Sequence, residues 1–294
     1  MRAAVVRTFG GPEAVEVVET ALPEPGARQV RIKVAASALN PVDAGVRAGA
    51  FGGAGRQIGL GWDVAGTVDA TGVATAWNAG DAVVALDYGM AEPLGAHAEY
   101  VVVDTDAVAK APATADAVHA ATLPLNGLTA VQALDGLRLT PGDTLLVTGA
   151  AGAVGGYAVQ LAAHRGVTVT GLARESDAEL VRSLGAAHAT TARAGAFDAV
   201  LDAAVLGETA LAWVRDGGAY TGVIPQAQPA SVRGVRTAAV EVSADGARLA
   251  ELVRLVDEGV LTLRVAETFA LDDAAKAHAR LAQGGVRGRL VLVP

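Results

Sequence analysis

Short valine-rich apolar runs, separated by Gly, Pro and Asp, occupy the first hundred residues. They are Ala3–Arg7, Val15–Val18, Gln29–Ala36, Val64–Ala70, Ala82–Leu86 and Ala98–Val103. Runs of this length and composition, bounded by turn residues, are typical of β-strands. No long helical periodicity occurs before about residue 116, so the pattern predicts a mostly antiparallel β-domain.

From Thr144 onward, apolar strands alternate with helical periods. The predicted strands are Thr144–Gly149, Thr168–Ala173, Ala189–Thr191, Ala199–Ala204, Ala219–Ile224 and Val235–Val242. The predicted helices between and after them are Ala153–Arg165, Asp177–Leu184, Glu208–Val214 and Gly246–Glu258. This alternation indicates an α/β fold with a doubly wound parallel sheet, the Rossmann arrangement. The tail returns to strand (Leu263–Phe269), helix (Asp272–Gln283) and strand (Arg289–Val293).

Composition narrows the class of protein. The 294 residues suffice for two ordinary domains, and 52% hydrophobic against 18% charged residues excludes a disordered chain. The net charge is −8 and no basic run exceeds two residues, which argues against a nucleic-acid partner. No charge-free apolar stretch of about 18 residues and no secretory leader is visible, so we expect a cytoplasmic protein without a membrane partner.

The chain has no cysteine, which excludes disulfides, iron–sulfur clusters, thiol catalysis and cysteine-ligated zinc. Its five histidines do not follow the spacing of a metal motif. They are His97, His119, His164, His188 and His278. We therefore predict no metal site.

The strongest local motif is a glycine loop between a buried strand and an amphipathic helix. It reads Gly149, Ala150, Ala151, Gly152, Ala153, Val154 and Gly155. Gly152 would let the backbone approach a pyrophosphate, and Gly155 would let the helix pack closely on the strand. The N–H groups at the helix start would then face the phosphates. Ala150 stands where the GxGxxG pattern has its first glycine, and a glycine-rich helix–strand contact without ligand is the alternative.

The end of the next strand indicates which dinucleotide binds. An NAD site places Asp or Glu there, whereas this chain has Arg174 followed by Glu175 and Ser176. Arg174 and Ser176 suit a ribose 2′-phosphate, which favours NADPH. The alternatives are that Arg174 is a solvated surface residue, or that Glu175 points at the ribose.

Several short segments, in order along nearly the whole chain, carry a family resemblance. They are Ala38–Asp43, Gly61–Gly66, Leu123–Ala130, Gly149–Gly155 and Gly284–Leu292. Together they resemble the zinc-independent medium-chain dehydrogenase/reductases, in their quinone oxidoreductase-like branch. The resemblance implies a β-rich GroES-like catalytic domain formed by residues 1–115 and 259–294. A Rossmann NADP-binding domain, residues 116–258, would be inserted in it, with the active site in the cleft between the two.

The resemblance also assigns roles to single residues. Asn40 would be the catalytic polar group facing the nicotinamide, while Asp43 and Arg47 would hold the loop around it. Asp202 would end a strand near the adenosine half. Further cofactor contacts would come from Asn126, Thr129, Gly222 and Val223. An edge strand near Val235–Val242 would pair two copies into a homodimer.

Without a metal to polarise an isolated ketone, the expected small-molecule substrate is a quinone or an α,β-unsaturated carbonyl. Family members carry tyrosines where this chain has Gly45 and Val46, so the substrate pocket is expected to be apolar. Its predicted walls are Phe51, Trp62 and Tyr88, for which ordinary core packing is the alternative. Two other functions stay open: an enoyl reductase acting on polyketide or acyl intermediates, and a non-catalytic NADPH-binding protein.

Overall fold

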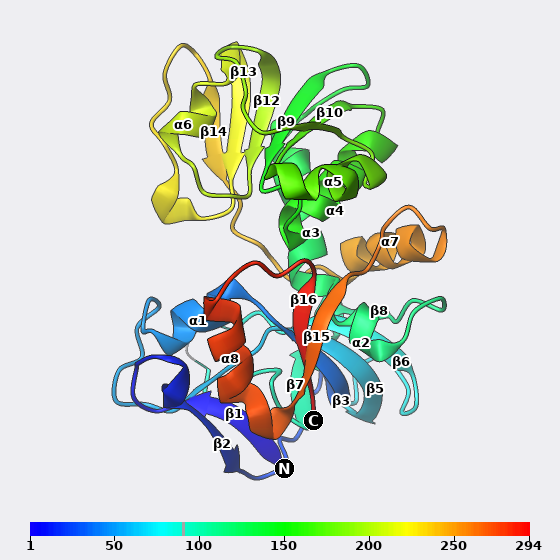
Figure 1. The fold of residues 1–294 in the computed structure, drawn as a ribbon. Coiled ribbons are helices and arrows are strands. Elements are labelled where there is room, and N and C mark those ends of the chain that lie inside the picture. The colour runs from blue at the N-terminus through cyan, green and yellow to red at the C-terminus, as the bar shows by residue number, and fades with distance from the viewer. Residues whose placement is uncertain (90–91) are drawn as a thin grey trace. The chain divides into compact units, whose positions relative to one another are not determined.

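The chain forms two compact units in the computed structural model, which describes residues 1–89 and 92–294. The first unit combines Met1–Leu125, Ser243–Glu258 and Leu263–Pro294, and the second combines Asn126–Val242 with Gly259–Thr262. Figure 1 shows both units, coloured from blue at the N-terminus to red at the C-terminus. One unit is therefore built from segments at both ends of the sequence, with the other inserted between them.

The first unit is rich in β-structure. Its strands are β1 (Arg2–Val6), β2 (Val15–Glu19), β3 (Gln29–Leu39), β4 (Ile58–Gly59), β5 (Asp63–Thr71), β6 (Ala82–Leu86), β7 (Tyr100–Asp104), β8 (Val108–Lys110), β15 (Val265–Ala270) and β16 (Arg289–Val293). Its helices are α1 (Pro41–Arg47), α2 (Ala117–Ala120), α7 (Gly246–Asp257) and α8 (Ala274–Ala282). One sheet has the order β15-β16-β3-β5-β6-β8, with β7 paired to β3, and a smaller sheet has the order β2-β1-β4. The predicted β-rich domain is confirmed.

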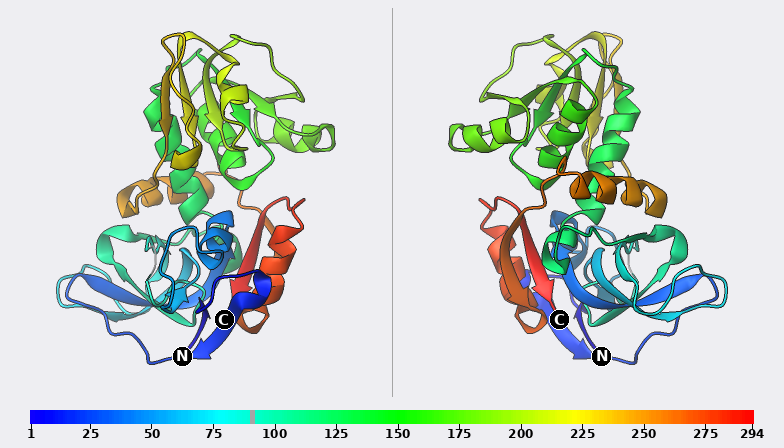
Figure 2. Two further views of the ribbon diagram at one scale, coloured as in Figure 1. Left: turned by 90° about the vertical axis from the view of Figure 1, so that its left-hand side faces the viewer. Right: turned by 90° about the vertical axis from the view of Figure 1, so that its right-hand side faces the viewer.

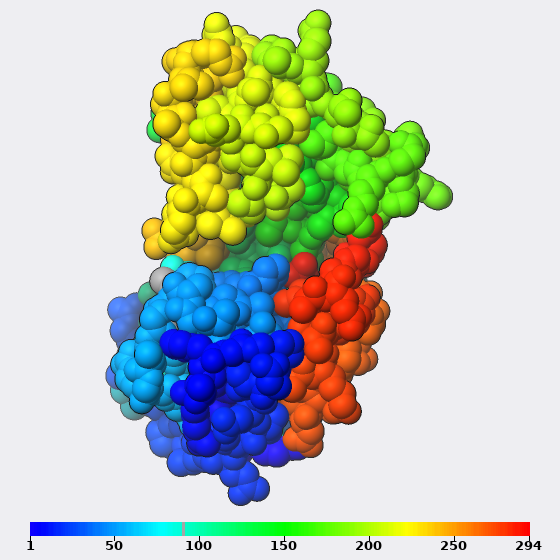
Figure 3. Space-filling model, turned by 60° about the vertical axis from the view of Figure 1, so that its left-hand side comes forward, coloured from blue at the N-terminus to red at the C-terminus, as the bar shows by residue number. Residues whose placement is uncertain are grey.

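The alternation of buried apolar and more exposed polar side chains along β3 explains why this long strand forms. Val30, Ile32 and Val34 point into a core shared with β5 and β6, while Lys33 between them is exposed. A second core joins the two ends of the chain, since Val6 of β1 packs with Leu290 and Leu292 of β16. The N-terminal and C-terminal segments accordingly lie side by side on the surface (Figure 3), where Arg2 pairs with Asp272 at 2.8 Å.

The second unit is a parallel sheet with helices, seen from two sides in Figure 2. Its strands are β9 (Thr144–Thr148), β10 (Thr168–Leu172), β11 (Ala187–Ala189), β12 (Phe197–Asp202), β13 (Val214–Gly222) and β14 (Arg236–Ala239). Its helices are α4 (Ala153–His164), α5 (Ala178–Ser183) and α6 (Glu208–Leu211), and α3 (Pro124–Leu137) enters it from the first unit. The strand order is β11-β10-β9-β12-β13-β14, which confirms the Rossmann-like sheet.

Helix α1 and the unit to which α7 belongs differ from the sequence prediction. Helix α1 was not predicted, because seven residues are too few to show a helical period; Pro41 at its first position and Asp43 in its first turn favour its start. Helix α7 and residues 116–125 belong to the first unit rather than the second. Asp257 of α7 accepts hydrogen bonds from the backbone N and Oγ1 of Thr114 at 3.0 and 2.8 Å. An apolar helical face does not reveal which of two cores it covers.

Close packing of α7 gives a stability prediction. A Cβ added at Gly246 would lie 2.5 Å from the carbonyl oxygen of Val108 and 2.8 Å from that of Asp106. We expect Gly246→Ala to lower the free energy of unfolding by about 1–3 kcal/mol, the usual cost of overpacking. Thermal unfolding followed by circular dichroism measures it.

The matched control is Gly136→Ala, at an exposed position of α3 where an added Cβ meets nothing within 4 Å. It should leave the melting temperature unchanged or raise it, because Ala has the higher helix propensity. Equal melting temperatures for the two variants would show that α7 is not packed on this backbone.

Candidate active site

The glycine loop follows β9 and leads directly into α4. Gly149 has φ +60°, a conformation that favours glycine, and its carbonyl oxygen accepts the N–H of Gly152 at 2.8 Å. A Cβ at Gly155 would lie only 2.2 Å from the same carbonyl oxygen. The first turn of α4 therefore touches the loop so closely that a side chain at Gly155 would displace it.

The loop fits the diphosphate of a dinucleotide. Gly152 caps the N-terminus of α4, and a Cβ there would lie 3.0 Å from the Gly149 oxygen, within the space the loop encloses. The first N–H groups of a helix lack acceptors within the helix and carry the positive end of its dipole. Ala153, Val154 and Gly155 supply these groups, so a phosphate would find donors where no side chain intervenes.

The carboxyl ends of three strands meet beside this loop. Thr148 of β9 is in register with Asp202 of β12, and Asp202 with Gly222 of β13. Gly222 and the following Val223 thus lie at the same edge of the sheet as the glycine loop, the edge at which open α/β sheets bind ligands. The other two predicted contacts, Asn126 and Thr129, lie buried in the first turns of α3.

Asp202 ties that edge together. Its buried carboxylate accepts hydrogen bonds from Thr148 Oγ1 at 2.6 Å, Gly207 N at 2.8 Å and the Tyr220 hydroxyl at 2.8 Å. Burial and this carboxylate raise the pKa of Tyr220, so the phenol stays protonated. Asp202 ends its strand as predicted, and its observed partners are protein groups that fix the ends of β9, β12 and β13.

The turn after β10 exposes the residues predicted to choose the dinucleotide. Arg174, Glu175 and Ser176 are all exposed there. A Cβ at Gly171, near the end of β10, would lie 2.8 Å from the Cβ of Ala150, so this strand runs directly against the glycine loop. Arg174 therefore lies in the turn that directly follows β10, the strand that contacts the glycine loop.

In the first unit, Asn40 lies between β3 and α1 with 1% of its surface exposed. Its Nδ2 donates to Asp63 Oδ2 at 2.6 Å and, over a longer 3.3 Å, to the carbonyl oxygen of Ala38. Its Oδ1 accepts from Arg289 Nη1 at 3.1 Å. Asn40 is thus held in a buried polar network that joins β3, β5 and β16.

Asp63 is the centre of this network, and no role was predicted for it from the sequence. Its Oδ1 accepts the backbone N–H of Leu125, in the first turn of α3, at 2.7 Å. Complete burial and, to a smaller extent, the charge of nearby Asp43 raise the pKa of Asp63 against the opposing effects of Leu125 N–H, Asn40 and Arg289, and the net pKa is about 7. A sequence signal existed: Asp63 and Arg289 are charged residues that each directly precede an apolar run.

Asp43 and Arg47 hold the loop, as predicted. Asp43 accepts the N–H of Asn40 at 2.7 Å and that of Gly61 at 3.0 Å, and burial raises its pKa. Arg47 donates to the carbonyl oxygen of Gly10 at 3.2 Å and contacts Nδ1 of His278 at 3.2 Å. Burial lowers the pKa of His278 to about 3, so this histidine is neutral at physiological pH.

The structure brings together two of the three predicted pocket walls. The rings of Trp62 and Tyr88 meet edge to face, with centroids 5.2 Å apart. Trp62 is buried, whereas Tyr88 is 37% exposed and lines a surface cavity of about 540 Å³. Phe51, 39% exposed, lies instead beside Gly45, where an added Cβ would be 3.2 Å from its ring.

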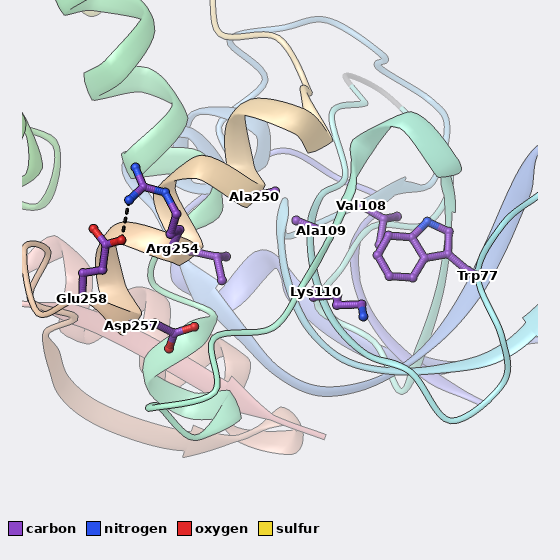
Figure 4. A pocket seen from close by; sticks show the side chains of 9 residues that line it. Trp77, Val108, Ala109, Lys110, Ala250, Arg254, Asp257 and Glu258 are labelled. Atoms are coloured by element: carbon purple, nitrogen blue, oxygen red, sulfur yellow. Dashed lines mark hydrogen bonds and ion pairs between the residues drawn. The ribbon is translucent and has the colours of Figure 1, made fainter.

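A second cavity, of about 470 Å³, lies between β8 and α7 (Figure 4). Trp77 and Lys110 line one side of it, and the ion-paired Arg254 and Glu258 the other. None of the predicted site residues lines it within the described part of the chain.

Two further findings concern residues 1–89 and 92–294. No group of three or more His, Asp or Glu side chains is arranged there to hold a metal ion. No helix there has the length and apolarity needed to cross a membrane.

Comparison with known proteins extends over the whole chain. Residues 26–113 match the alcohol dehydrogenase GroES-like domain, and residues 177–292 match the zinc-binding dehydrogenase family. A quinone oxidoreductase of Pseudomonas aeruginosa is 31% identical over 97% of both chains. The chloroplastic NADPH-dependent alkenal/one oxidoreductase of Arabidopsis thaliana is 31% identical, over 100% of this chain and 80% of that protein. A component of the pikromycin polyketide synthase of Streptomyces venezuelae is 39% identical over 63% of this chain, within 5% of its own length.

Solved structures agree with these matches. The quinone oxidoreductase from Coxiella burnetii superposes with a TM-score of 0.90 at 29% identity, covering 100% of this chain and 99% of that one. A mycobacterial protein solved in complex with NADPH superposes with a TM-score of 0.85 at 27% identity, covering all of both chains. Sequence and fold together show that this chain belongs to the medium-chain dehydrogenase/reductases, in the branch of the quinone oxidoreductases.

Proposed function

We propose that the protein is an NADPH-dependent reductase that delivers hydride, without a metal, to a quinone or an α,β-unsaturated carbonyl. The observation that carries the proposal is the loop between β9 and α4, where Gly155 leaves no room for a side chain beside the Gly149 oxygen. The names of relatives that act on quinones and on alkenals or alkenones support the substrate class.

NADPH is the proposed cofactor because Arg174 follows the strand that contacts the glycine loop. A charge-assisted hydrogen bond from its guanidinium to a 2′-phosphate would contribute about 1.5–3 kcal/mol. When bound, the nicotinamide supplies the hydride. The chain itself would hold the diphosphate on the N–H groups of Ala153–Gly155 and the adenosine phosphate on Arg174 and Ser176, with Asn126, Thr129, Gly222 and Val223 as further contacts.

In the catalytic unit, Asn40 is the proposed donor to the substrate oxygen that becomes negative. Its short bond to Asp63 fixes one N–H, and the longer contact with Ala38 leaves the second N–H the easier to redirect. Hydrogen bonds to catalytic groups are often loose before substrate binds. Trp62 and Tyr88 would form an apolar, aromatic wall beside a flat conjugated substrate.

The second candidate is an enoyl reductase for polyketide or acyl intermediates. It is favoured by the 39% identity to a segment of a polyketide synthase component. The hydride chemistry would be the same, since an enoyl thioester is also an α,β-unsaturated carbonyl. Only the length of the substrate and its thioester distinguish the two candidates.

Cofactor preference tests Arg174. We expect the wild-type protein to bind NADPH roughly 10- to 100-fold more tightly than NADH, as follows from the bond energy above. Arg174→Ala should remove most of that preference by weakening NADPH binding alone. Fluorescence titration of both nucleotides measures the dissociation constants.

Arg182→Ala is the matched control, an exposed arginine on α5 of the same unit, and should preserve the preference. Equal wild-type affinities for NADPH and NADH would contradict the cofactor assignment.

Turnover tests the reaction. Loss of NADPH absorbance is followed with panels of quinones, enones and acyl thioesters, and we expect oxidation with the first two. Asn40→Ala should lower kcat about 10²- to 10³-fold, the cost typical of losing an oxyanion donor. Activity restricted to acyl thioesters would select the enoyl reductase, and tight NADPH binding without turnover on any acceptor would indicate a binding protein.

We also propose a homodimer. β14 is the last strand in the order of the parallel sheet, so its outer edge is available for pairing with a second copy. Sedimentation velocity at micromolar concentration should give the mass of two chains, and a single-chain mass would contradict the proposal. Arg236→Pro, at the first residue of β14, should weaken the dimer by removing a backbone donor and restricting the strand.

A further inference from the structure

The side-chain amide of Asn40 lies between two groups of opposite hydrogen-bonding character. On one side Arg289 Nη1 stands 3.1 Å from Oδ1, and on the other Asp63 Oδ2 stands 2.6 Å from Nδ2. A guanidinium only donates, and an ionised carboxylate only accepts. Of the two ways to turn the amide, only the one observed satisfies both neighbours.

We propose that ionised Asp63 is a positioning residue that fixes the orientation of the Asn40 amide and at the same time anchors the first turn of α3. The inference rests on the proposed function, in which Asn40 donates to the substrate. Asp63 divides its oxygens between the two tasks, since Oδ2 accepts from Asn40 and Oδ1 accepts from Leu125 N at 2.7 Å.

Burial prevents the Asn40 amide from adopting the other orientation. Asp63 is fully buried and Asn40 is 1% exposed, so water is not a ready substitute for a lost partner. A buried donor without an acceptor costs about 1–3 kcal/mol, which is enough to keep an amide from turning over. A neutral side chain at position 63 would remove this constraint.

Protonation of Asp63 would release the Asn40 amide in the same way as a neutral side chain at position 63. The charged groups around Asp63 are Asp43, from α1, which raises its pKa, and Arg289, from β16, which lowers it; the Asn40 amide and Leu125 N–H, at the start of α3, lower it as well. With burial dominant, the pKa of Asp63 lies at about 7. Below that pH the carboxyl gains a proton. Because the Leu125 N–H already uses Oδ1 as its acceptor, the proton is favoured on Oδ2, which then faces the Asn40 amide as a donor and a weaker acceptor. Turnover should therefore fall as the pH falls through 7 and be retained above it.

Nuclear magnetic resonance tests the coupling without requiring turnover. The chain has only three asparagines, Asn40, Asn78 and Asn126, so selective ¹⁵N-asparagine labelling yields three side-chain amide pairs, and Asn40→Gln identifies one of them. We expect the Asn40 pair to shift with a midpoint near pH 7, and we expect Asp63→Asn to abolish that shift.

Asp87→Asn is the matched control. Burial, Glu92 and Asp104 raise the pKa of Asp87 to about 7 as well, and Asp87 takes no part in the hydrogen bonds that join Asn40 to Ala38, Asp63 and Arg289. This variant should leave the Asn40 titration in place. An Asn40 pair that does not titrate, or that still titrates in Asp63→Asn, would overturn the inference.

Steady-state kinetics test whether Asp63 affects turnover. Asp63→Asn should lower kcat about 10- to 100-fold, the scale of a misplaced catalytic group, with a smaller change in KM for NADPH. It should also remove the acid limb of the pH profile, which Asp87→Asn should keep. Unchanged kcat in Asp63→Asn would overturn the positioning role while leaving the proposed activity standing.

Exchanging the pair, Asn40→Asp together with Asp63→Asn, separates positioning from stability. The hydrogen bonds to Arg289 and Leu125 stay complementary, so thermal stability should exceed that of Asp63→Asn alone. The donor to the substrate is absent, so kcat should stay low. Recovery of kcat would contradict the inference, because network integrity alone would then suffice. If the wild-type protein reduced no acceptor, the proposed function would fail, while the amide titration would still decide the coupling.

Discussion

No side chain fits between the carbonyl oxygen of Gly149 and the first turn of α4, and this close approach holds the start of the helix against the glycine loop. A Cβ at Gly155 would lie 2.2 Å from the oxygen, well inside van der Waals contact. The contact brings the N-terminus of α4 to the carboxyl edge of the sheet, next to the ends of β12 and β13. The positive end of the helix dipole and the N–H groups of the first helical turn then lie at the same point, which suits a diphosphate.

In each unit a buried carboxylate holds several groups together beside the candidate site. Asp202 accepts hydrogen bonds from Thr148, Gly207 and Tyr220 in the second unit. Asp63 accepts hydrogen bonds from Asn40 and Leu125 in the first. Burying a carboxylate is costly unless donors surround it, so each fixes several backbone and side-chain positions at once. Polar residues that look isolated in the sequence thereby become the points at which strands, loops and helix starts are held.

The helices and strands whose apolar residues recur at regular spacing were predictable from the sequence. Strands of the first unit and the alternating elements of the second follow from their apolar spacing, and the glycine loop follows from its place between strand and helix. Helix α1 was too short to show a period, and the amphipathic α7 did not reveal which unit it packs on. The partners of Asn40 could not be predicted either, because Asp63 and Arg289 lie 23 and 249 residues away and meet it only through sheet pairing. Among the pocket residues, size and apolarity predicted burial for Trp62 but did not separate Phe51 from the other two.

We propose that the glycine loop and the turn after β10 hold NADPH. A crystal structure of the complex tests it most directly. The diphosphate should accept hydrogen bonds from the backbone N–H groups at the start of α4, and the 2′-phosphate should lie against Arg174. A complex with the diphosphate away from this loop, or with the 2′-phosphate in solvent and Glu175 bound to the ribose, would contradict the claim.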